Sequence, residues 1–367
     1  MRSRAASASE PGLTSRRRTD FDESDIRIRP NPRGTRPRSK SRPRHEDAEP
    51  AWVVAVDRGR YTCLVGEGTS DERLVTAMKA RELGRSGVLV GDRVALVGDA
   101  SGVPGSLARV VRVEPRTSML RRSADDTDPV ERGIVANAER LAIVTALADP
   151  TPRPRMVDRC LVAAYDAGLD PLLVLTKADL TDPAGFVDHY APLHVPYVVT
   201  SRRPDGGWQG LDDVLSAMSS RVTVLVGHSG VGKSTLVNAL VPGADRATGV
   251  VNDVTGRGRH TSTSAVALRL PEGGWVVDTP GVRSFGLAHV DPNRIVHHFP
   301  ELAAGTQECP RGCSHDEPEC GLDDFVAAGG AGPAGSARLR SLRRLLHSRA
   351  SSDTGSDTGP DDGAQES

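Results

Sequence analysis

The chain has 367 residues and a formal net charge of −1, with 37% hydrophobic and 26% charged residues. This length predicts two or three domains of a soluble globular protein. Composition argues against a membrane protein, because no apolar stretch approaches the length of a span, and against a secretory signal, because the Arg-rich N-terminus has no apolar segment. Five cysteines, three of them clustered, favour a metal site in a reducing cytoplasm over a disulfide framework.

Both ends of the chain are expected to be disordered. Residues 1–49 are rich in Arg, Pro and Ser and hold few large apolar side chains, so they cannot bury enough surface to offset their ordering entropy. This basic arm is either a solvated tail or a segment that neutralises nucleic-acid phosphates. Residues 351–367 are interpreted as a disordered acidic tail.

Residues 50–122 have the pattern of a small all-β barrel. Short β-type runs are separated by turns that contain Gly and Asp; they cover 51–56, 61–65, 93–97 and 108–113. The oligonucleotide-binding fold is one such five-stranded barrel. Trp52 and Tyr61 are the main candidates for stacking on bases. Composition alone leaves RNA binding and a plain structural barrel equally open.

From residue 138 the pattern changes to alternating strands and helices. The predicted strands are 140–147, 171–175, 195–200, 221–226, 264–270 and 274–277. The predicted helices are 156–167, 211–218 and one that begins at Thr235. This alternation predicts an α/β domain with a parallel sheet covered by helices on both faces.

A complete phosphate-binding loop, Gly-His-Ser-Gly-Val-Gly-Lys-Ser, lies between a predicted strand and a predicted helix. Its glycines let backbone N–H groups turn toward a β-phosphate, and the helix N-terminus favours negative charge. Lys233 is expected to reach the β- and γ-phosphates, and the Ser234 hydroxyl to bind Mg²⁺. The expected nucleotide contacts are Gly227, His228, Ser229, Gly230, Val231, Gly232, Lys233, Ser234 and Thr235.

A second motif, Thr176-Lys177-Ala178-Asp179, closes a predicted strand and resembles the Asn-Lys-x-Asp guanine motif of GTPases. The Asp179 carboxylate can accept from guanine N1–H and N2–H₂, which adenine does not offer, and the Lys177 stem would lie along the base. Thr176 replaces the usual Asn and predicts weaker local bracing. Thr200-Ser201 resembles the element whose backbone contacts the base.

Asp278-Thr279-Pro280-Gly281 matches the Asp-x-x-Gly element of GTPases, in which the Asp binds Mg²⁺ through water and the Gly N–H faces the γ-phosphate. The loop 255–263 before it has the character of a switch. Ordinary GTPases place the guanine motif last, whereas here it precedes the phosphate loop. A circularly permuted GTPase domain explains this order.

Cys309, Cys313, His315 and Cys320 form a cluster near the C-terminus. Three thiolates and one imidazole match a closed tetrahedral zinc site of structural type. Residues 322–328 and 337–347 are predicted helices beside it. The second helix carries Arg338, Arg340, Arg343 and Arg344, which form either a surface for rRNA or a solvated face.

The motif order, with a barrel before it and a Cys/His cluster after it, resembles the ribosome small-subunit-dependent GTPase family (RsgA, also called YjeQ). The resemblance covers roughly residues 51–350 and includes 258–261, 278–283 and Phe285-Gly286. The family pattern resembles Cys-x₄-Cys-x-His-x₅-Cys; here the first and last gaps are each one residue shorter, which affects the loop geometry and not the ligand set. The resemblance implies a cytoplasmic GTPase that acts on the small ribosomal subunit and its rRNA in late maturation.

The resemblance also implies the arrangement of domains. The expected parts are a disordered arm (1–49), an oligonucleotide-binding barrel (50–122), a permuted P-loop GTPase domain (123–290), a small helical zinc-binding domain (291–350) and a disordered tail (351–367). A monomer with one structural zinc ion, and magnesium bound together with GTP, is expected.

The catalytic residue is less directly indicated. Many GTPases orient the attacking water with a Gln after the Asp-x-x-Gly element, but Val282 stands there and cannot do so. His260 in the switch loop is the candidate replacement, and the resemblance points to the same residue. Either Thr261 or Ser262 supplies the switch hydroxyl for Mg²⁺.

Two other functions stay open: an RNA chaperone switched by GTP without meaningful turnover, and an ATP-using P-loop enzyme such as a small-molecule kinase.

Overall fold

The computed structural model describes residues 45–84, 87–123, 131–244, 265–279, 285, 287 and 289–350. The acidic tail and almost all of the basic arm lie outside the described residues, as do His260, Thr261, Ser262, Gly281 and Val282. Within the described ranges no helix is long and apolar enough to cross a membrane.

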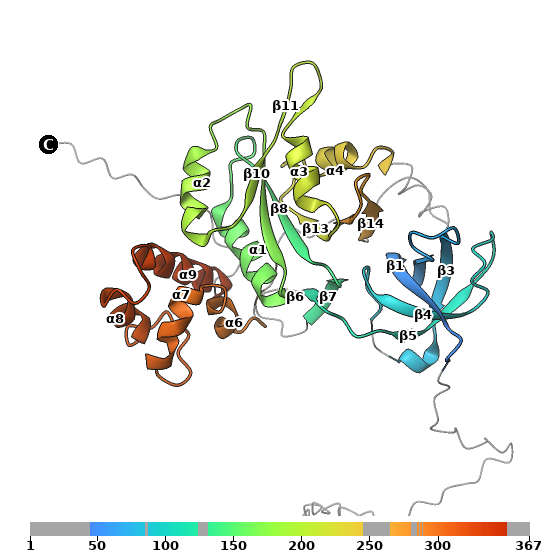
Figure 1. The fold of residues 1–367 in the computed structure, drawn as a ribbon, viewed down its shortest axis with the longest axis horizontal. Coiled ribbons are helices and arrows are strands. Elements are labelled where there is room, and N and C mark those ends of the chain that lie inside the picture. The colour runs from blue at the N-terminus through green and yellow to red at the C-terminus, as the bar shows by residue number, and fades with distance from the viewer. Residues whose placement is uncertain are drawn as a thin grey trace, which may run out of the picture. The chain divides into compact units, whose positions relative to one another are not determined.

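A five-stranded barrel forms the first described part (blue to cyan in Figure 1). Its strands are β1 (Glu49–Asp57), β2 (Arg60–Val65), β3 (Arg73–Lys79), β4 (Arg93–Gly98) and β5 (Ala108–Val113), with a short 3₁₀ turn, η2 (Arg81–Leu83). They pair in the order β1-β2-β3-β5-β4, and β4 returns to β1, which closes the barrel. Alternate residues such as Val53, Cys63, Val75 and Val110 fill one core cluster. The predicted oligonucleotide-binding-like barrel is therefore confirmed.

Two expectations about the barrel are wrong. Trp52 and Tyr61 are each 7% exposed and belong to the core, so they offer no open face for stacking bases. The Trp52 indole N–H donates to the Gly91 carbonyl at 3.0 Å, which fixes the ring inward. The sequence pattern also missed β3, whose inward residues Val75 and Ala77 alternate with Thr76 and Met78.

A hairpin of β6 (Met119–Ser123) and β7 (Glu131–Ala136) precedes the α/β part, whose strands and helices alternate as predicted. Its elements are β8 (Arg140–Ala146), α1 (Pro154–Ala167), β9 (Asp170–Thr176), α2 (Ala184–Tyr190), η3 (Ala191–Leu193), β10 (Tyr197–Val199), β11 (Ser201–Arg202), β12 (Trp208–Gln209), α3 (Leu211–Met218), β13 (Val222–Val226), α4 (Lys233–Leu240), β14 (Val266–Arg269) and β15 (Trp275–Asp278).

The strands β10-β9-β8-β13-β15 lie side by side and are parallel, and β14 pairs antiparallel with β15. One bridge, between Ala55 of β1 and Val266 of β14, joins the barrel to this sheet. Ile143 and Leu173 point into the cluster that contains α1, whereas Val144 packs in the cluster that contains α3 and α4. Both faces are thus buried, which explains the nearly continuous apolar runs of these strands.

The C-terminal part is helical, with α6 (Pro292–Val296), α7 (Pro300–Ala303), η4 (Ala304–Glu308), α8 (Gly321–Ala327) and α9 (Gly335–Ala350). Helix α9 packs along α1 (Figure 1). Arg344 lies 3.1 Å from the Asp158 carboxylate of α1. Burial raises the pKa of Asp158 to about 6 even though Arg344 favours its ionised form.

The four arginines of α9 differ in their surroundings. Arg338 is buried, pairs with Glu301 and lies over the Phe299 ring. Arg344 pairs with a buried carboxylate, as described above, and Arg343 pairs with Asp323. Both open interpretations, an rRNA surface and a solvated face, are therefore wrong for the buried Arg338. Arg343 and Arg344 are partly exposed and Arg340 is exposed, so both interpretations stay open for these three.

Candidate nucleotide site and metal centre

The phosphate loop joins β13 to α4, as its sequence requires. Gly227 follows β13, and a Cβ at this position would lie 2.6 Å from the Val144 carbonyl of β8, so only glycine fits. Gly232 caps α4 with a φ of 91°, a left-handed conformation that glycine adopts without strain. Helix α4 starts at Lys233, and its N-terminus therefore faces the loop with unpaired N–H groups suited to an anion.

The acid of the Asp-x-x-Gly element lies next to the phosphate loop. Strand β15 runs beside β13, with Asp278 opposite Leu225. The Lys233 ammonium forms an ion pair with the Asp278 carboxylate, and both side chains are mostly buried. The Thr279 hydroxyl donates to the Leu225 carbonyl at 2.9 Å, which holds the start of this element against β13. Lys233 and Asp278 thus meet at one edge of the sheet.

The guanine motif follows β9 at the same edge. The buried Thr176 hydroxyl donates to the Val231 carbonyl of the phosphate loop at 2.6 Å. Lys177 has a φ of 60°, and its ammonium donates to the Asp149 carbonyl. The Ala178 N–H donates to the Thr200 carbonyl at 3.4 Å. One hydroxyl therefore connects the guanine motif to the phosphate loop.

A cavity of about 330 Å³ lies between the two motifs. It is lined by Thr176, Lys177, Asp179, Leu180, Ser201, Arg202, Trp208, Val231, Gly232 and Thr235. The cavity is therefore lined by residues from three segments: the predicted guanine motif, the element after β10 and the phosphate loop. The cavity lining does not include the other described candidates, namely Ala178, Thr200, Gly227, His228, Ser229, Gly230, Lys233, Ser234 and Asp278.

Sequence reasoning missed three residues of this lining: Leu180, Arg202 and Trp208. Arg202 and Trp208 lie opposite each other on the β11–β12 hairpin. An Asp205-Gly206 pair between them is a hairpin signal that could have placed both strands.

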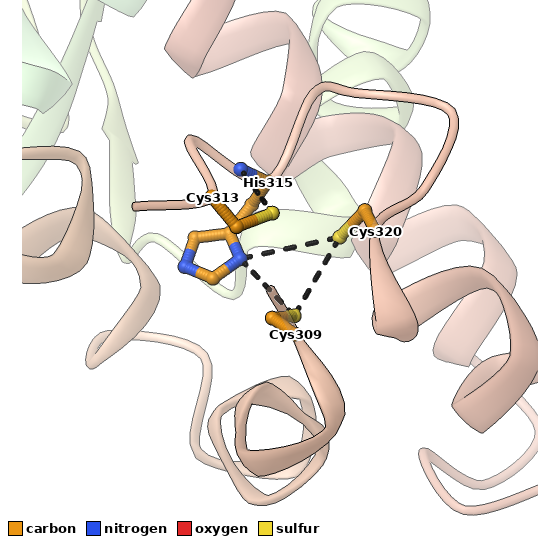
Figure 2. Close-up of side chains that lie close together, drawn as sticks. All are labelled: Cys309, Cys313, His315 and Cys320. Atoms are coloured by element: carbon orange, nitrogen blue, oxygen red, sulfur yellow. Dashed lines mark hydrogen bonds between the residues drawn. The ribbon is translucent and has the colours of Figure 1, made fainter. Parts of the chain in front are cut away.

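The four predicted metal ligands come together. Cys309 ends η4, Cys313 and His315 lie in the following loop, and Cys320 caps α8. Figure 2 shows their side chains pointing toward one another, and all four ligand atoms lie within 4.8 Å of each other. The Cys309 sulfur lies 3.8 Å from the Cys320 sulfur and 3.6 Å from His315 Nδ1.

This geometry fits a tetrahedral metal. Metal–sulfur bonds of about 2.3 Å place neighbouring tetrahedral ligands about 3.5–3.8 Å apart. His315 Nδ1, rather than Nε2, faces the sulfurs. Arg343 donates to the His315 carbonyl at 3.1 Å and pairs with Asp323 of α8, so α9 supports the ligand loop. The donor set is therefore capable of holding one metal ion.

Comparisons with known proteins agree with this arrangement. Residues 113–288 match the family model described as RsgA GTPase. A Gemmatimonas aurantiaca protein named small ribosomal subunit biogenesis GTPase RsgA is 36% identical over 308 residues, which cover 82% of this chain and 95% of that relative. A Pseudomonas aeruginosa protein of the same name is 37% identical over 276 residues, covering 72% and 77%.

Two solved structures share the fold. The crystal structure of YjeQ from Thermotoga maritima has a TM-score of 0.59 and 25% identity, and covers 82% of this chain and 98% of that one. YloQ, described as a circularly permuted GTPase, has a TM-score of 0.57 and 21% identity, and covers 84% and 99%. The permuted order, with β9 before β13, is thereby confirmed. The chain belongs to the RsgA GTPase family, a family of GTP hydrolases.

Proposed function

We propose that the chain binds GTP between the guanine motif and the phosphate loop, and hydrolyses it while bound to the small ribosomal subunit and its rRNA during subunit biogenesis. The observation that carries the proposal is the single cavity lined by Asp179, Lys177 and Ser201 on one side and Gly232 and Thr235 on the other. The relatives named for small-subunit biogenesis align over most of both chains, which supports the partner.

Each motif has a proposed role. Asp179 accepts from the guanine edge, Lys177 lies along the base, and Ala178, Thr200 and Ser201 contact it through their backbone. The loop from Gly227 to Thr235 surrounds the phosphates, with Lys233 as the cation.

Magnesium is bound by Ser234 directly and by Asp278 through water, and either Thr261 or Ser262 supplies the switch hydroxyl. The Gly281 N–H faces the γ-phosphate, and His260 positions or deprotonates the attacking water. The last four of these residues lie outside the described part of the chain, so they rest on sequence alone.

The metal in the Cys/His cluster is proposed to be one structural zinc ion held by Cys309, Cys313, His315 and Cys320. The four side chains leave no ligand position for substrate, because a tetrahedral ion is saturated by three sulfurs and one nitrogen.

The domain limits proposed above, 50–122, 123–290 and 291–350, place this site in the last domain. The protein is proposed to act as a cytoplasmic monomer.

The test is GTP hydrolysis by the purified chain, with and without small ribosomal subunits, and with ATP as the control nucleotide. Hydrolysis specific for GTP and stimulated by the small subunit is expected. Hydrolysis of ATP at a similar rate would favour a different P-loop enzyme, and GTP binding without stimulated turnover would favour a nucleotide-switched RNA chaperone. Stimulation of His260→Ala equal to that of the wild type would show that His260 is not catalytic.

A further inference from the structure

The β11–β12 hairpin adds a wall to the nucleotide cavity that the guanine motif does not supply. Trp208 is half-buried and lines the cavity together with Arg202. The Arg202 guanidinium lies 5.0 Å from the centroid of the Trp208 ring, in the range of a cation–π contact. Trp208 also packs against the core cluster that contains α3 and α4, so Arg202 and this cluster together hold the residue at the cavity wall.

The hairpin holds Trp208 at a fixed place relative to the guanine elements. Ser201 pairs with Gln209, and Arg202 pairs with Trp208. The buried Thr200 hydroxyl donates to the Gln209 carbonyl at 2.8 Å, so the backbone beside Trp208 is tied to the end of β10. The indole is therefore positioned by the same segment that contributes Ser201 to the cavity.

Guanine is a flat ring with an edge and two faces, and these need different partners. Asp179 can satisfy only the edge, and the Lys177 stem offers a narrow aliphatic surface. A large aromatic ring supplies the flat apolar surface that a purine or its ribose prefers. Within the described cavity lining Trp208 is the aromatic residue, since the other members are aliphatic, polar or charged.

We propose that Trp208, held by Arg202, is a binding residue for the guanosine moiety and packs against the base or its ribose. The proposal rests on the nucleotide site proposed above and names a wall of that site. Every purine has the same flat faces, so Trp208 contributes affinity for GTP and GDP alike, whereas Asp179 determines the preference for guanine over adenine.

The test measures the affinity of the full-length chain for GDP and GTP by calorimetry. Trp208→Ala is expected to weaken both nucleotides by about 5- to 150-fold, the range for losing one base–aromatic stack. Trp208→Phe keeps a flat ring and is expected to stay within roughly threefold of the wild type. Arg202→Ala, which removes the cation over the ring and one polar side chain of the cavity lining, is expected to cost about two- to fivefold.

A second readout uses the three tryptophans, Trp52, Trp208 and Trp275. Energy transfer from protein to a GDP labelled with N-methylanthraniloyl on the ribose is expected to fall strongly in Trp208→Phe. Trp275→Phe, a half-buried tryptophan on β15, is the matched control and is expected to keep most of the transfer. Wild-type affinity in Trp208→Ala, or equal transfer in the two Phe variants, would overturn the proposal.

Failure of this proposal and failure of the proposed function are distinguishable. If the wild type binds no guanine nucleotide, the nucleotide site itself is wrong. If the wild type binds GDP and Asp179→Asn loses the preference over ADP while Trp208→Ala binds normally, only the role of Trp208 is wrong. Trp208 also packs against the core cluster that contains α3 and α4. Trp208→Ala is therefore expected to lower the melting temperature, and its affinity is measured at a temperature where circular dichroism shows the variant to be folded.

Discussion

Thr176→Val removes the one hydroxyl that connects the guanine motif to the phosphate loop. Thr176 is 4% exposed, and its Oγ1 donates to the Val231 carbonyl at 2.6 Å. Valine has nearly the same shape, so the substitution removes the donor and leaves no cavity. The Val231 carbonyl then remains buried without this donor, which costs about 1–3 kcal/mol.

This cost is expected to appear in nucleotide affinity. Val231 lies between Gly230 and Gly232, both with positive φ, so the loop is built from conformationally permissive residues. Without the hydroxyl, the loop samples more conformations, and nucleotide binding has to select the competent one. A loss of about 1–3 kcal/mol corresponds to a GDP dissociation constant about 5- to 150-fold higher.

Isothermal calorimetry with GDP measures this effect, and Thr176→Ser, which keeps the hydroxyl, is expected to bind within roughly threefold of the wild type. Thr223→Val on β13 is the matched control. Thr223 is fully buried, and its hydroxyl has no hydrogen-bond partner among the described residues. Its loss is therefore expected to leave GDP affinity unchanged. If Thr176→Val also bound GDP like the wild type, the hydroxyl would not brace the loop.

Three further predictions test the metal centre, a buried carboxyl and the phosphate loop. The wild type is expected to hold about one zinc ion per chain, and Cys320→Ser is expected to hold much less and to melt at a lower temperature. Cys63→Ser, which lies outside the cluster, is expected to keep the metal. Elemental analysis measures the zinc content of each protein. The folded chain keeps the proton on Asp158 up to about pH 6, but the unfolded chain releases it near 3.8. The unfolding free energy of the wild type relative to Asp158→Asn should therefore fall by about 2 kcal/mol from pH 4 to 6, and by about 3 kcal/mol in all between about pH 3 and 7, as denaturant titrations would measure; a flat difference would contradict the raised pKa. Gly227→Ala places a Cβ against the backbone of β8 and should abolish GDP binding, while Gly185→Ala, where a Cβ meets open space, should bind normally.

Features encoded by short, contiguous residue patterns could be predicted from the sequence. The phosphate loop, the guanine motif and the permuted order depend on residues that are neighbours in the chain, and their strand ends follow from apolar runs such as 221–226. The Cys/His cluster likewise spans only residues 309–320. Local spacing is sufficient here because the chemistry requires particular residue types at fixed positions.

The features that the sequence missed depend on distant partners. Strand β3 holds Arg73 and Lys79 at its ends and pairs with both β2 and β5, so its strand character comes from the barrel rather than from its own hydrophobicity. Arg338 appears solvent-facing in a basic helix, yet it pairs with Glu301. Charge alone cannot predict such a partner, because the partner is brought close only by the fold.

The permuted order has a consequence for how the sheet and the helices around the Cys/His cluster are connected. Phe285 lies seven positions after Asp278, and its carbonyl accepts a hydrogen bond from Arg159 of α1. The same guanidinium donates to the Ser348 carbonyl of α9 at 2.8 Å. Arg159 is 2% exposed, and a buried cation deprived of its acceptors costs on the order of several kcal/mol. Phe285 and the helix that supports the Cys/His loop are therefore both held by Arg159, so displacing either of them leaves the buried guanidinium without one of its acceptors.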